Sequence, residues 1–250
     1  MTQKALHRPA LTVLDTPEEV AETAARRILD QLRAAPRSVL GLATGRSPVA
    51  IYAHLAEAHR AGTSFAGVES FNLDEYIGLG PEDPGSFAHY MHRHVFDRLD
   101  MAPGQGHVPD GLGDPASVAR AYETAIAAAG GIDLQLLGIG RNGHIGFNEP
   151  GSAFDSRTRV VTLDESTRRA NAPDFAPGAE VPREALTMGI GTILEARRIL
   201  LVATGAAKSA ALHAALHMPP APDCPASALQ LHPRVEVLCD RAAAARLKDG

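Results

Sequence analysis

Residues 137–150 (LGIGRNGHIGFNEP) concentrate side chains that are suited to moving protons. His144 is of the residue type that changes its charge near neutral pH, and Asn142 or Glu149 could orient its ring or hydrogen-bond to a substrate. Four glycines surround these residues after an apolar run, a pattern typical of a loop that follows a buried strand. We predict that the loop carries acid–base chemistry; the alternative is a glycine turn whose polar groups only satisfy the backbone.

A second candidate for proton transfer is the acidic pair Asp74 and Glu75, which closes the apolar stretch 68–73. Adjacent residues of an extended chain point to opposite sides, so at most one of the two carboxylates is expected to face a pocket. A carboxylate in a partly dry cleft is a natural base for removing a proton from carbon. The alternative is an ordinary turn or helix-capping carboxylate.

Two expected strand–turn–helix junctions are suited to binding a phosphate. The turn Thr44-Gly45-Arg46-Ser47 offers backbone N–H groups, hydroxyls and the positive end of a helix dipole. Lys208 follows Thr204-Gly205 in a similar place. Each junction alone reads equally well as a capped helix or a solvated cation, but two in one sheet favour a phosphorylated substrate.

We call residues 137–150 the histidine loop. Its glycines also match the GxGxxG pattern of dinucleotide-binding sites, with Asp164 about twenty residues further on. That site needs a helix that opens at the third glycine, Gly143, so that its N-terminus meets the pyrophosphate. Here Gly146 and Pro150 follow, and an ordinary helix tolerates neither well. We therefore expect no nucleotide cofactor at this loop.

Other catalytic and metal-binding patterns are weak or absent. Histidines cluster in two places: the first group is His89, His92 and His94, and the second is His213 and His217. Neither group has the HExxH form or a nearby cysteine, so we expect no metal site. The sequence contains no GxSxG elbow and no GxxxxGK[ST] loop, which disfavours a serine hydrolase of the usual α/β type and a P-loop enzyme.

The elements that must position these residues follow from the apolar pattern. Strands are expected at 11–14, 39–43, 68–73, 132–139, 199–203 and 235–239, and helices at 17–34, 86–99, 116–129 and after residues 47 and 205. Ser47 and Pro48 read as the N-cap and first residue of their helix. The alternation predicts an α/β fold: a single-domain, doubly wound, mostly parallel sheet across residues 1–250, with helices on both faces. Ligands of such sheets bind at the carboxyl ends of strands, where the polar loops lie.

The overall composition limits the classes of molecule that the protein is expected to bind. The chain has 250 residues, 45% of them hydrophobic, and a formal net charge of -5. The mild acidic charge argues against nucleic-acid or anionic-membrane binding, so we expect a small-molecule partner. Cys224 and Cys239 have no paired-motif spacing and read as buried thiols. No apolar run approaches the about 18 residues needed to span a bilayer, and we expect a cytoplasmic protein.

Taken together, these stretches resemble the glucosamine-6-phosphate deaminase family, also called glucosamine-6-phosphate isomerases. The resemblance covers nearly the whole chain in the family's order, and its longest block, GIGRNGHIGFNEPG, is highly specific. The matching segments are residues 40–48 (LGLATGRSP), 71–76 (FNLDEY), 138–151, 156–159 (SRTR), 185–191 (ALTMGIG) and 225–229 (PASAL).

The resemblance implies hydrolytic deamination of glucosamine 6-phosphate to fructose 6-phosphate and ammonia, with no metal or organic cofactor. It implies that Asp74 takes the C2 proton and returns it at C1, while His144 assists opening of the sugar ring. Asn142 and Glu149 would support His144, and because some members have Asp in place of Asn142, either residue could orient the ring. The family includes both monomers and hexamers, so a homo-oligomer is open.

The same resemblance places the substrate phosphate at the 44–47 turn, with Arg168 and Lys208 as cationic partners. Arg46 stands where the family usually has a small residue, and its long side chain permits either a phosphate contact or a solvent-exposed position.

Two other functions compete with deamination. A 6-phosphogluconolactonase-like hydrolase would also hold a sugar phosphate and use a histidine, but lactone hydrolysis needs no base at a sugar C2, which the 71–76 segment supplies. A non-catalytic sugar-phosphate sensor would usually carry a DNA-binding helix-turn-helix segment, whereas here the α/β pattern begins almost at once.

The resemblance also predicts the response to N-acetylglucosamine 6-phosphate. Members that this effector activates carry a lysine that aligns with Val161, although Arg159 is retained. We expect weak or absent activation, because the lysine charge is missing. Initial rates of ammonia release with and without the effector test this, and a several-fold increase would contradict it.

Overall fold

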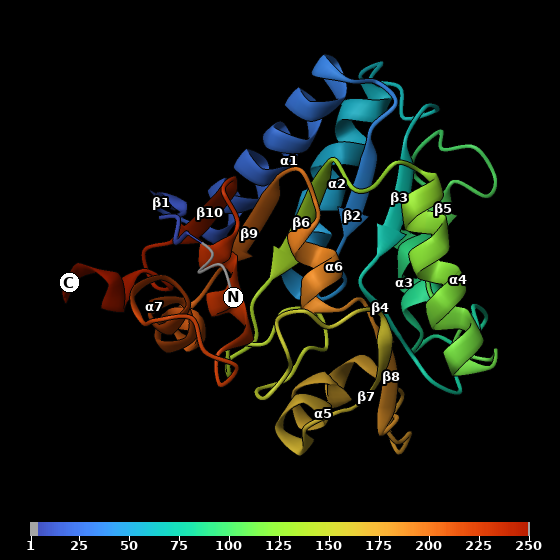
Figure 1. The fold of residues 1–250 in the computed structure, drawn as a ribbon. Coiled ribbons are helices and arrows are strands. Elements are labelled where there is room, and N and C mark those ends of the chain that lie inside the picture. Colours follow the sequence, from blue (N-terminus) through green and yellow to red (C-terminus); the bar gives the residue numbers. More distant parts are fainter. Residues whose placement is uncertain (1–4, 250) are drawn as a thin grey trace.

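The computed structural model describes residues 5–249, which form a seven-stranded parallel sheet with helices on both faces (Figure 1). Every neighbouring pair in this sheet is parallel, so the predicted doubly wound α/β fold is confirmed. The predicted domain of residues 1–250 includes residues 1–4 and 250, which lie outside the described part. The strand order is β1 (Ala10–Leu14), β10 (Val235–Asp240), β9 (Ile199–Ala203), β6 (Leu134–Gly138), β2 (Val39–Leu42), β3 (Glu69–Asn72) and β5 (Gly106–His107).

The strand order reverses between β2 and β6, which are neighbours. From β2 the chain moves outward to β3 and β5, and from β6 it moves the other way to β9 and β10. Right-handed crossovers then place helices on opposite faces. On one face are α1 (Pro17–Ala34) and α2 (Arg46–Arg60), and on the other are α4 (Pro115–Ala128), α6 (Ile190–Leu194) and α7 (Ser209–His217). The crevice at this reversal is where such folds bind ligands.

The predicted helix at 17–34 is confirmed as α1, and its local sequence explains where it begins and which side is buried. The hydroxyl of Thr16 accepts a hydrogen bond from the N–H of Glu19 at 3.2 Å, and Pro17 occupies the first turn. Val20, Ala24 and Ile28 recur at helical spacing and are buried. This stripe faces the sheet, so capping, proline placement and apolar period all agree with the structure.

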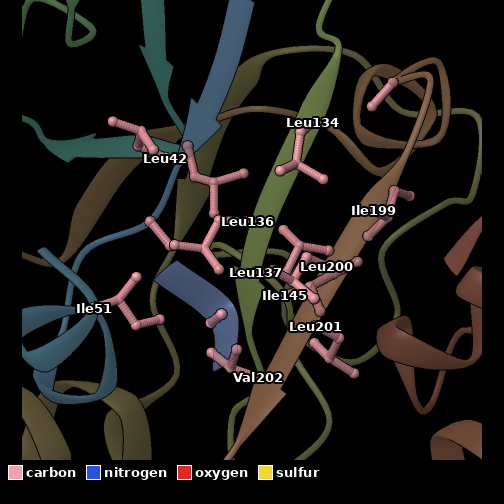
Figure 2. Close-up of a cluster of buried hydrophobic side chains, with 14 of the residues drawn as sticks. Leu42, Ile51, Leu134, Leu136, Leu137, Ile145, Ile199, Leu200, Leu201 and Val202 are labelled. Carbon is pink, nitrogen blue, oxygen red and sulfur yellow. The ribbon is translucent and has the colours of Figure 1, made fainter. Parts of the chain in front are cut away.

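The central strands are apolar on both faces and form the core shown in Figure 2. Leu136 and Leu137 of β6 and Leu200 and Leu201 of β9 are at most 1% exposed. Ile145, from the loop after β6, also inserts into this cluster and is fully buried. Burial of one such side chain contributes about 1.5–3 kcal/mol, so the histidine loop is anchored to the core beside its catalytic candidates.

A second, antiparallel sheet was not predicted from the sequence. It consists of β4 (Asp74–Tyr76), β8 (Glu184–Thr187) and β7 (Arg159–Thr162). Residues 74–76 read as the start of a loop, because three residues are too few to show an alternating pattern. Figure 1 shows this small sheet and α5 (Glu165–Asn171) at one end of the large sheet.

The two sheets meet at Leu73. Its N–H donates to the carbonyl of Leu42 in β2 at 3.1 Å, and its own carbonyl accepts the N–H of Met188, next to β8, at 2.7 Å. Consecutive residues of one extended segment therefore belong to different sheets. Asp74 starts immediately after this junction, which fixes its backbone from both sides.

The remaining elements are short. The helix that was predicted at 86–99 begins as α3 (Phe87–Met91), with Ser86 as its N-cap, and continues as a π-helical turn, His92–Phe96. Short 3₁₀ segments occupy Ala172–Asp174, Ala206–Lys208, Pro225–Leu231 and Ala245–Asp249. Within residues 5–249, no helix combines the length and apolar character needed to cross a membrane.

Candidate active site

Asp74 is a buried carboxylate at the junction of the two sheets, with 5% of its surface exposed. Burial, reinforced by the negative charge of Glu75, raises its pKa to about 8, against the opposing effect of the Phe147 peptide N–H. Burial penalises the charged form because the interior solvates it poorly. The group is therefore suited to accepting a proton near neutral pH.

Glu75 points elsewhere and has a structural role. It is 1% exposed, and its carboxylate accepts the N–H groups of Tyr76, Phe87 and Ala88 at 2.8 to 2.9 Å. Two of these donors begin α3, so Glu75 caps that helix from a distant strand. Burial raises its pKa to about 7, and the three N–H donors act in the opposite direction. The expectation that only one of the two acids faces the site agrees with this geometry.

The histidine loop folds back on itself through glycine. The N–H of Gly140 donates to the carbonyl of His144 at 2.8 Å, and the His144 ring lies directly over Gly140. A Cβ at residue 140 would come within 2.4 Å of three ring atoms, so only glycine fits there. Gly143 has a φ of 86° and begins a turn rather than a helix. The nucleotide-binding pattern is thus not followed by the helix that such a site requires.

Glu149 is the side chain that faces the His144 ring. Its Oε2 lies 3.5 Å from His144 Nδ1, longer than an ordinary hydrogen bond, and Nδ1 has no other partner among the described residues. The same Oε2 accepts the side-chain N–H of Asn142 at 2.7 Å, while Asn142 Oδ1 accepts the backbone N–H of His144 at 3.2 Å. Asn142 therefore aligns both partners, and Glu149 supplies the charge next to the ring.

The ionisation of Glu149 suits this pairing. Burial alone would raise its pKa, but the adjacent His144 ring and the hydrogen bonds from Thr167 and Asn142 together outweigh burial and leave the pKa below its usual value. Glu149 is thus a carboxylate at neutral pH and places a negative charge beside the His144 ring.

The loop with His144 and the carboxylate of Asp74 converge, as the sequence analysis expected for two carboxyl ends of one sheet. A Cβ at Gly146 would lie 3.4 Å from Asp74 Oδ2 and 3.1 Å from Thr187 Oγ1. Thr187, at the end of β8, also accepts the N–H of Phe147 at 3.1 Å. Sequence reasoning did not single out Thr187; its only signal was the matching segment 185–191.

The two phosphate-type turns also lie side by side. Gly45 has a φ of 110° and is the N-cap residue of α2, so the prediction that Ser47 caps this helix was wrong. Ser47 lies in the first turn instead, and its Oγ is 3.2 Å from Thr204 Oγ1 in the other turn. The helix begins earlier because glycine adopts the positive φ that starts it, and no side-chain cap is needed.

Lys208 closes the second of these turns. Gly205, with a φ of 86°, donates its N–H to the buried Asp240 at 2.9 Å, which fixes the turn. Burial, and then the nearby positive charge of Arg141, lower the pKa of Lys208. Among the side chains that the structure describes, no carboxylate pairs with this half-buried ammonium, so it is electrostatically suited to an anion.

The two predicted arginines have other contacts in this structure. Arg46 is exposed, and its Nη2 lies 3.6 Å from Asp174 Oδ1. Arg168 donates from Nε and Nη2 to the carbonyl of Val181 at 3.1 and 2.9 Å. Thr44, which precedes Gly45, is half-buried. The phosphate roles of Arg46 and Arg168 stay predictions.

The chain is similar to known proteins over nearly its whole length. A glucosamine-6-phosphate deaminase of Hahella chejuensis is 50% identical over 237 residues, which cover 94% of this chain and 91% of that protein. A solved structure of a monomeric glucosamine-6-phosphate deaminase is 46% identical, with a TM-score of 0.92 and coverage of 95% and 99%. A 6-phosphogluconolactonase from Trypanosoma cruzi shares the fold at 20% identity, with a TM-score of 0.79 and coverage of 98% and 99%.

The doubly wound fold and the site at its strand reversal define a sugar-phosphate enzyme. The chain belongs to the family of glucosamine-6-phosphate isomerases and 6-phosphogluconolactonases, whose model matches residues 15–238.

The burial of Asp74 predicts a pH-dependent effect of its replacement on stability. Because the folded-state pKa of about 8 lies above the ordinary aspartate value of 3.8, ionisation of Asp74 lowers the stability of the wild type as pH rises from about 4 to about 8. Asp74→Asn should therefore gain stability relative to wild type across this window, on the order of 1.4 kcal/mol per pKa unit, and the difference should level off above it.

Chemical unfolding at pH 5, 7 and 9 measures this difference. Asp30→Asn, on the exposed side of α1, is the matched control and should show little dependence on pH. A gain for Asp74→Asn that stays constant from pH 5 to pH 9 would contradict the burial of an ionisable Asp74.

Proposed function

We propose that this protein catalyses the hydrolytic deamination and aldose–ketose isomerisation of glucosamine 6-phosphate, giving fructose 6-phosphate and ammonia. The observation that carries the proposal is the buried Asp74, whose pKa is raised to about 8, beside the loop of His144 and Glu149. The names of relatives at about half identity support the same activity. The fold alone does not favour it over lactone hydrolysis, since both activities occur on this fold.

The reaction begins with binding and ring opening. The two turns that contain Ser47 and Lys208 hold the phosphate through backbone N–H groups, hydroxyls and one ammonium. His144 takes the proton of the anomeric hydroxyl and gives one to the ring oxygen, so that the ring opens to the aldehyde. Glu149 stabilises the imidazolium that forms in between.

Asp74 then carries out the isomerisation. Its carboxylate removes the proton from C2 while the substrate ammonium gives a proton to the C1 oxygen, which leaves an enolamine, and Asp74 then returns its proton to C1. The product is a protonated ketimine at C2. Water adds to this carbon, a proton passes from the added water to nitrogen, and the carbon–nitrogen bond breaks to give the ketone and ammonia, released as ammonium. A positive charge on the substrate nitrogen next to C2 favours ionised Asp74, so binding lowers the pKa of the base when it is needed.

We also propose that residues 1–250 act as one catalytic domain in the cytoplasm on a free small molecule. The mild net charge of -5 supports a partner other than nucleic acid.

The activity is tested by supplying purified protein with glucosamine 6-phosphate and following ammonia and fructose 6-phosphate. We expect both products in equal amounts, and little hydrolysis of 6-phosphogluconolactone in a parallel assay. A folded protein that leaves the amino sugar untouched would disprove the proposal, and efficient lactone hydrolysis would favour the other activity of the family.

The role of Asp74 has a sharper test. Asp74→Asn should slow the exchange of the C2 proton with deuterated solvent by at least about a hundredfold, because the amide cannot accept a proton. Binding of substrate should remain measurable by calorimetry. Proton NMR of the substrate measures the exchange, with Asp30→Asn as a control that retains it. Exchange at the wild-type rate in Asp74→Asn would assign the base to another residue.

Lys208→Ala should mainly weaken binding of the phosphorylated substrate. Loss of a charge-assisted contact costs about 1.5–3 kcal/mol, so KM should rise roughly tenfold to a hundredfold while kcat changes less. Steady-state kinetics measure both, and Arg33→Ala, an exposed cation on α1, is the matched control. An unchanged KM in Lys208→Ala would remove this lysine from the phosphate site.

A further inference from the structure

One face of α5 and the turn after it carries three polar side chains at helical spacing. They are Thr167, Asn171 and Asp174, at relative positions i, i+4 and i+7, which lie on one side of a helix. Each contacts a different part of the candidate active site. Thr167 Oγ1 donates to Glu149 Oε1, Asn171 Nδ2 donates to Tyr76 Oη, and Asp174 pairs with Arg46. Together, these three contacts hold this face of the segment against the candidate active site.

The contact of Thr167 with Glu149 is the most buried of the three. The Oγ1–Oε1 distance is 2.6 Å, Thr167 is 5% exposed, and the side chain of Glu149 is 13% exposed. The other oxygen of the carboxylate, Oε2, accepts from Asn142 at 2.7 Å and faces His144 Nδ1 at 3.5 Å. One oxygen of Glu149 is thus held by α5, and the other is left for the histidine loop.

The Thr167 hydroxyl donates to a residue outside its own helix. A threonine within a helix often hydrogen-bonds to the carbonyl three or four residues earlier, but here the hydroxyl is directed to a residue 18 positions away. The start of α5 is capped separately by Asp164, whose Oδ1 accepts the N–H of Ser166 at 2.7 Å. The structure uses Thr167 for a tertiary contact.

We propose that Thr167 is a positioning residue for deamination: its hydroxyl fixes the carboxylate plane of Glu149 so that Oε2 stays directed at His144. The inference rests on the proposed roles of His144 and Glu149. With the Thr167 and Asn142 donors on opposite oxygens, the carboxylate cannot rotate about its terminal bond without breaking one hydrogen bond. Loss of the Thr167 donor allows that rotation. It also removes a hydrogen bond that stabilises the ionised form of Glu149, so the pKa of Glu149 rises.

Two substitutions separate this role from simple packing. A positioning role predicts that the Val variant has the lower kcat, whereas a packing role predicts that the Ser variant does. Thr167→Val keeps the shape but removes the donor, and Thr167→Ser keeps the donor but removes a methyl group. We expect kcat to fall about tenfold in Thr167→Val, as for loss of a hydrogen bond to a charged group, with KM changed less than about twofold. Thr167→Ser should stay within about twofold of wild type. A Ser variant that is slower than the Val variant would overturn the proposal.

The pH profile of kcat gives an independent measurement. The ionisable groups around the pair are His144 on the loop and Asp164 at the start of α5, which is close enough to feel the charge of His144. Thr167→Val leaves both in place, so a change in the acid limb reports on Glu149. We expect the acid limb to move up by about half a unit to one unit, because the carboxylate protonates more easily without its donor. An unshifted limb in Thr167→Val would contradict the proposal.

A variant at Glu149 distinguishes failure of this inference from failure of the proposed pair. If Thr167 acts through Glu149, Thr167→Val should cost little when added to Glu149→Gln, which is itself expected to be impaired. Impaired Glu149→Gln with fully active Thr167→Val would overturn the role of Thr167 alone. Wild-type activity of Glu149→Gln would overturn both roles.

Arg169→Ala, on the exposed side of α5, controls for general disturbance of the helix and should retain wild-type kinetics and pH profile. If Thr167→Val folds poorly by circular dichroism, Thr167→Ala replaces it, since it also lacks the donor and adds no bulk. The same loss of kcat and shift of the acid limb are expected from it.

Discussion

The backbone of Leu73 hydrogen-bonds in two directions: its N–H donates to Leu42 in the large parallel sheet, and its carbonyl accepts from Met188, the residue after β8 of the small antiparallel sheet. This junction determines where Asp74 lies and how much water reaches it. A carboxylate that emerged from the end of a single sheet would meet solvent, whereas Asp74 is enclosed by both. Its raised pKa is a consequence of that enclosure, and the proposed role of Asp74 as a base depends on it.

The histidine loop depends on the same junction. Thr187, at the end of β8, holds the loop through the N–H of Phe147, and the small sheet thereby keeps the loop close to Asp74. Ile145 anchors the loop to the large core from the other side. A free segment rich in glycine would have many conformations. Because these two attachments restrict the loop, less conformational entropy is lost when its side chains align with a substrate.

Polar contacts from α5 and the 3₁₀ turn after it reach three parts of the site. Thr167 contacts the carboxylate beside His144, Asn171 contacts β4, the strand that begins with Asp74, and Asp174 contacts the first residue of α2. A helix of seven residues gains little stability by itself, so its placement depends on these contacts and on β7 and β8.

The sequence by itself determined the parallel fold, the strand β9 at 199–203 and the stretches that carry Asp74, His144 and Lys208. These features have a periodic or compositional signal, because buried strands and amphipathic helices repeat their apolar residues within a few positions. Only the tertiary structure decided that β4 joins a second sheet, that Ser47 lies inside α2 and that Glu149 rather than Asn142 faces His144 Nδ1. The cap that Glu75 provides for α3 and the bond from Thr167 to Glu149 join residues 12 to 18 positions apart. Such contacts depend on how whole elements pack, and no local pattern of residue types records that.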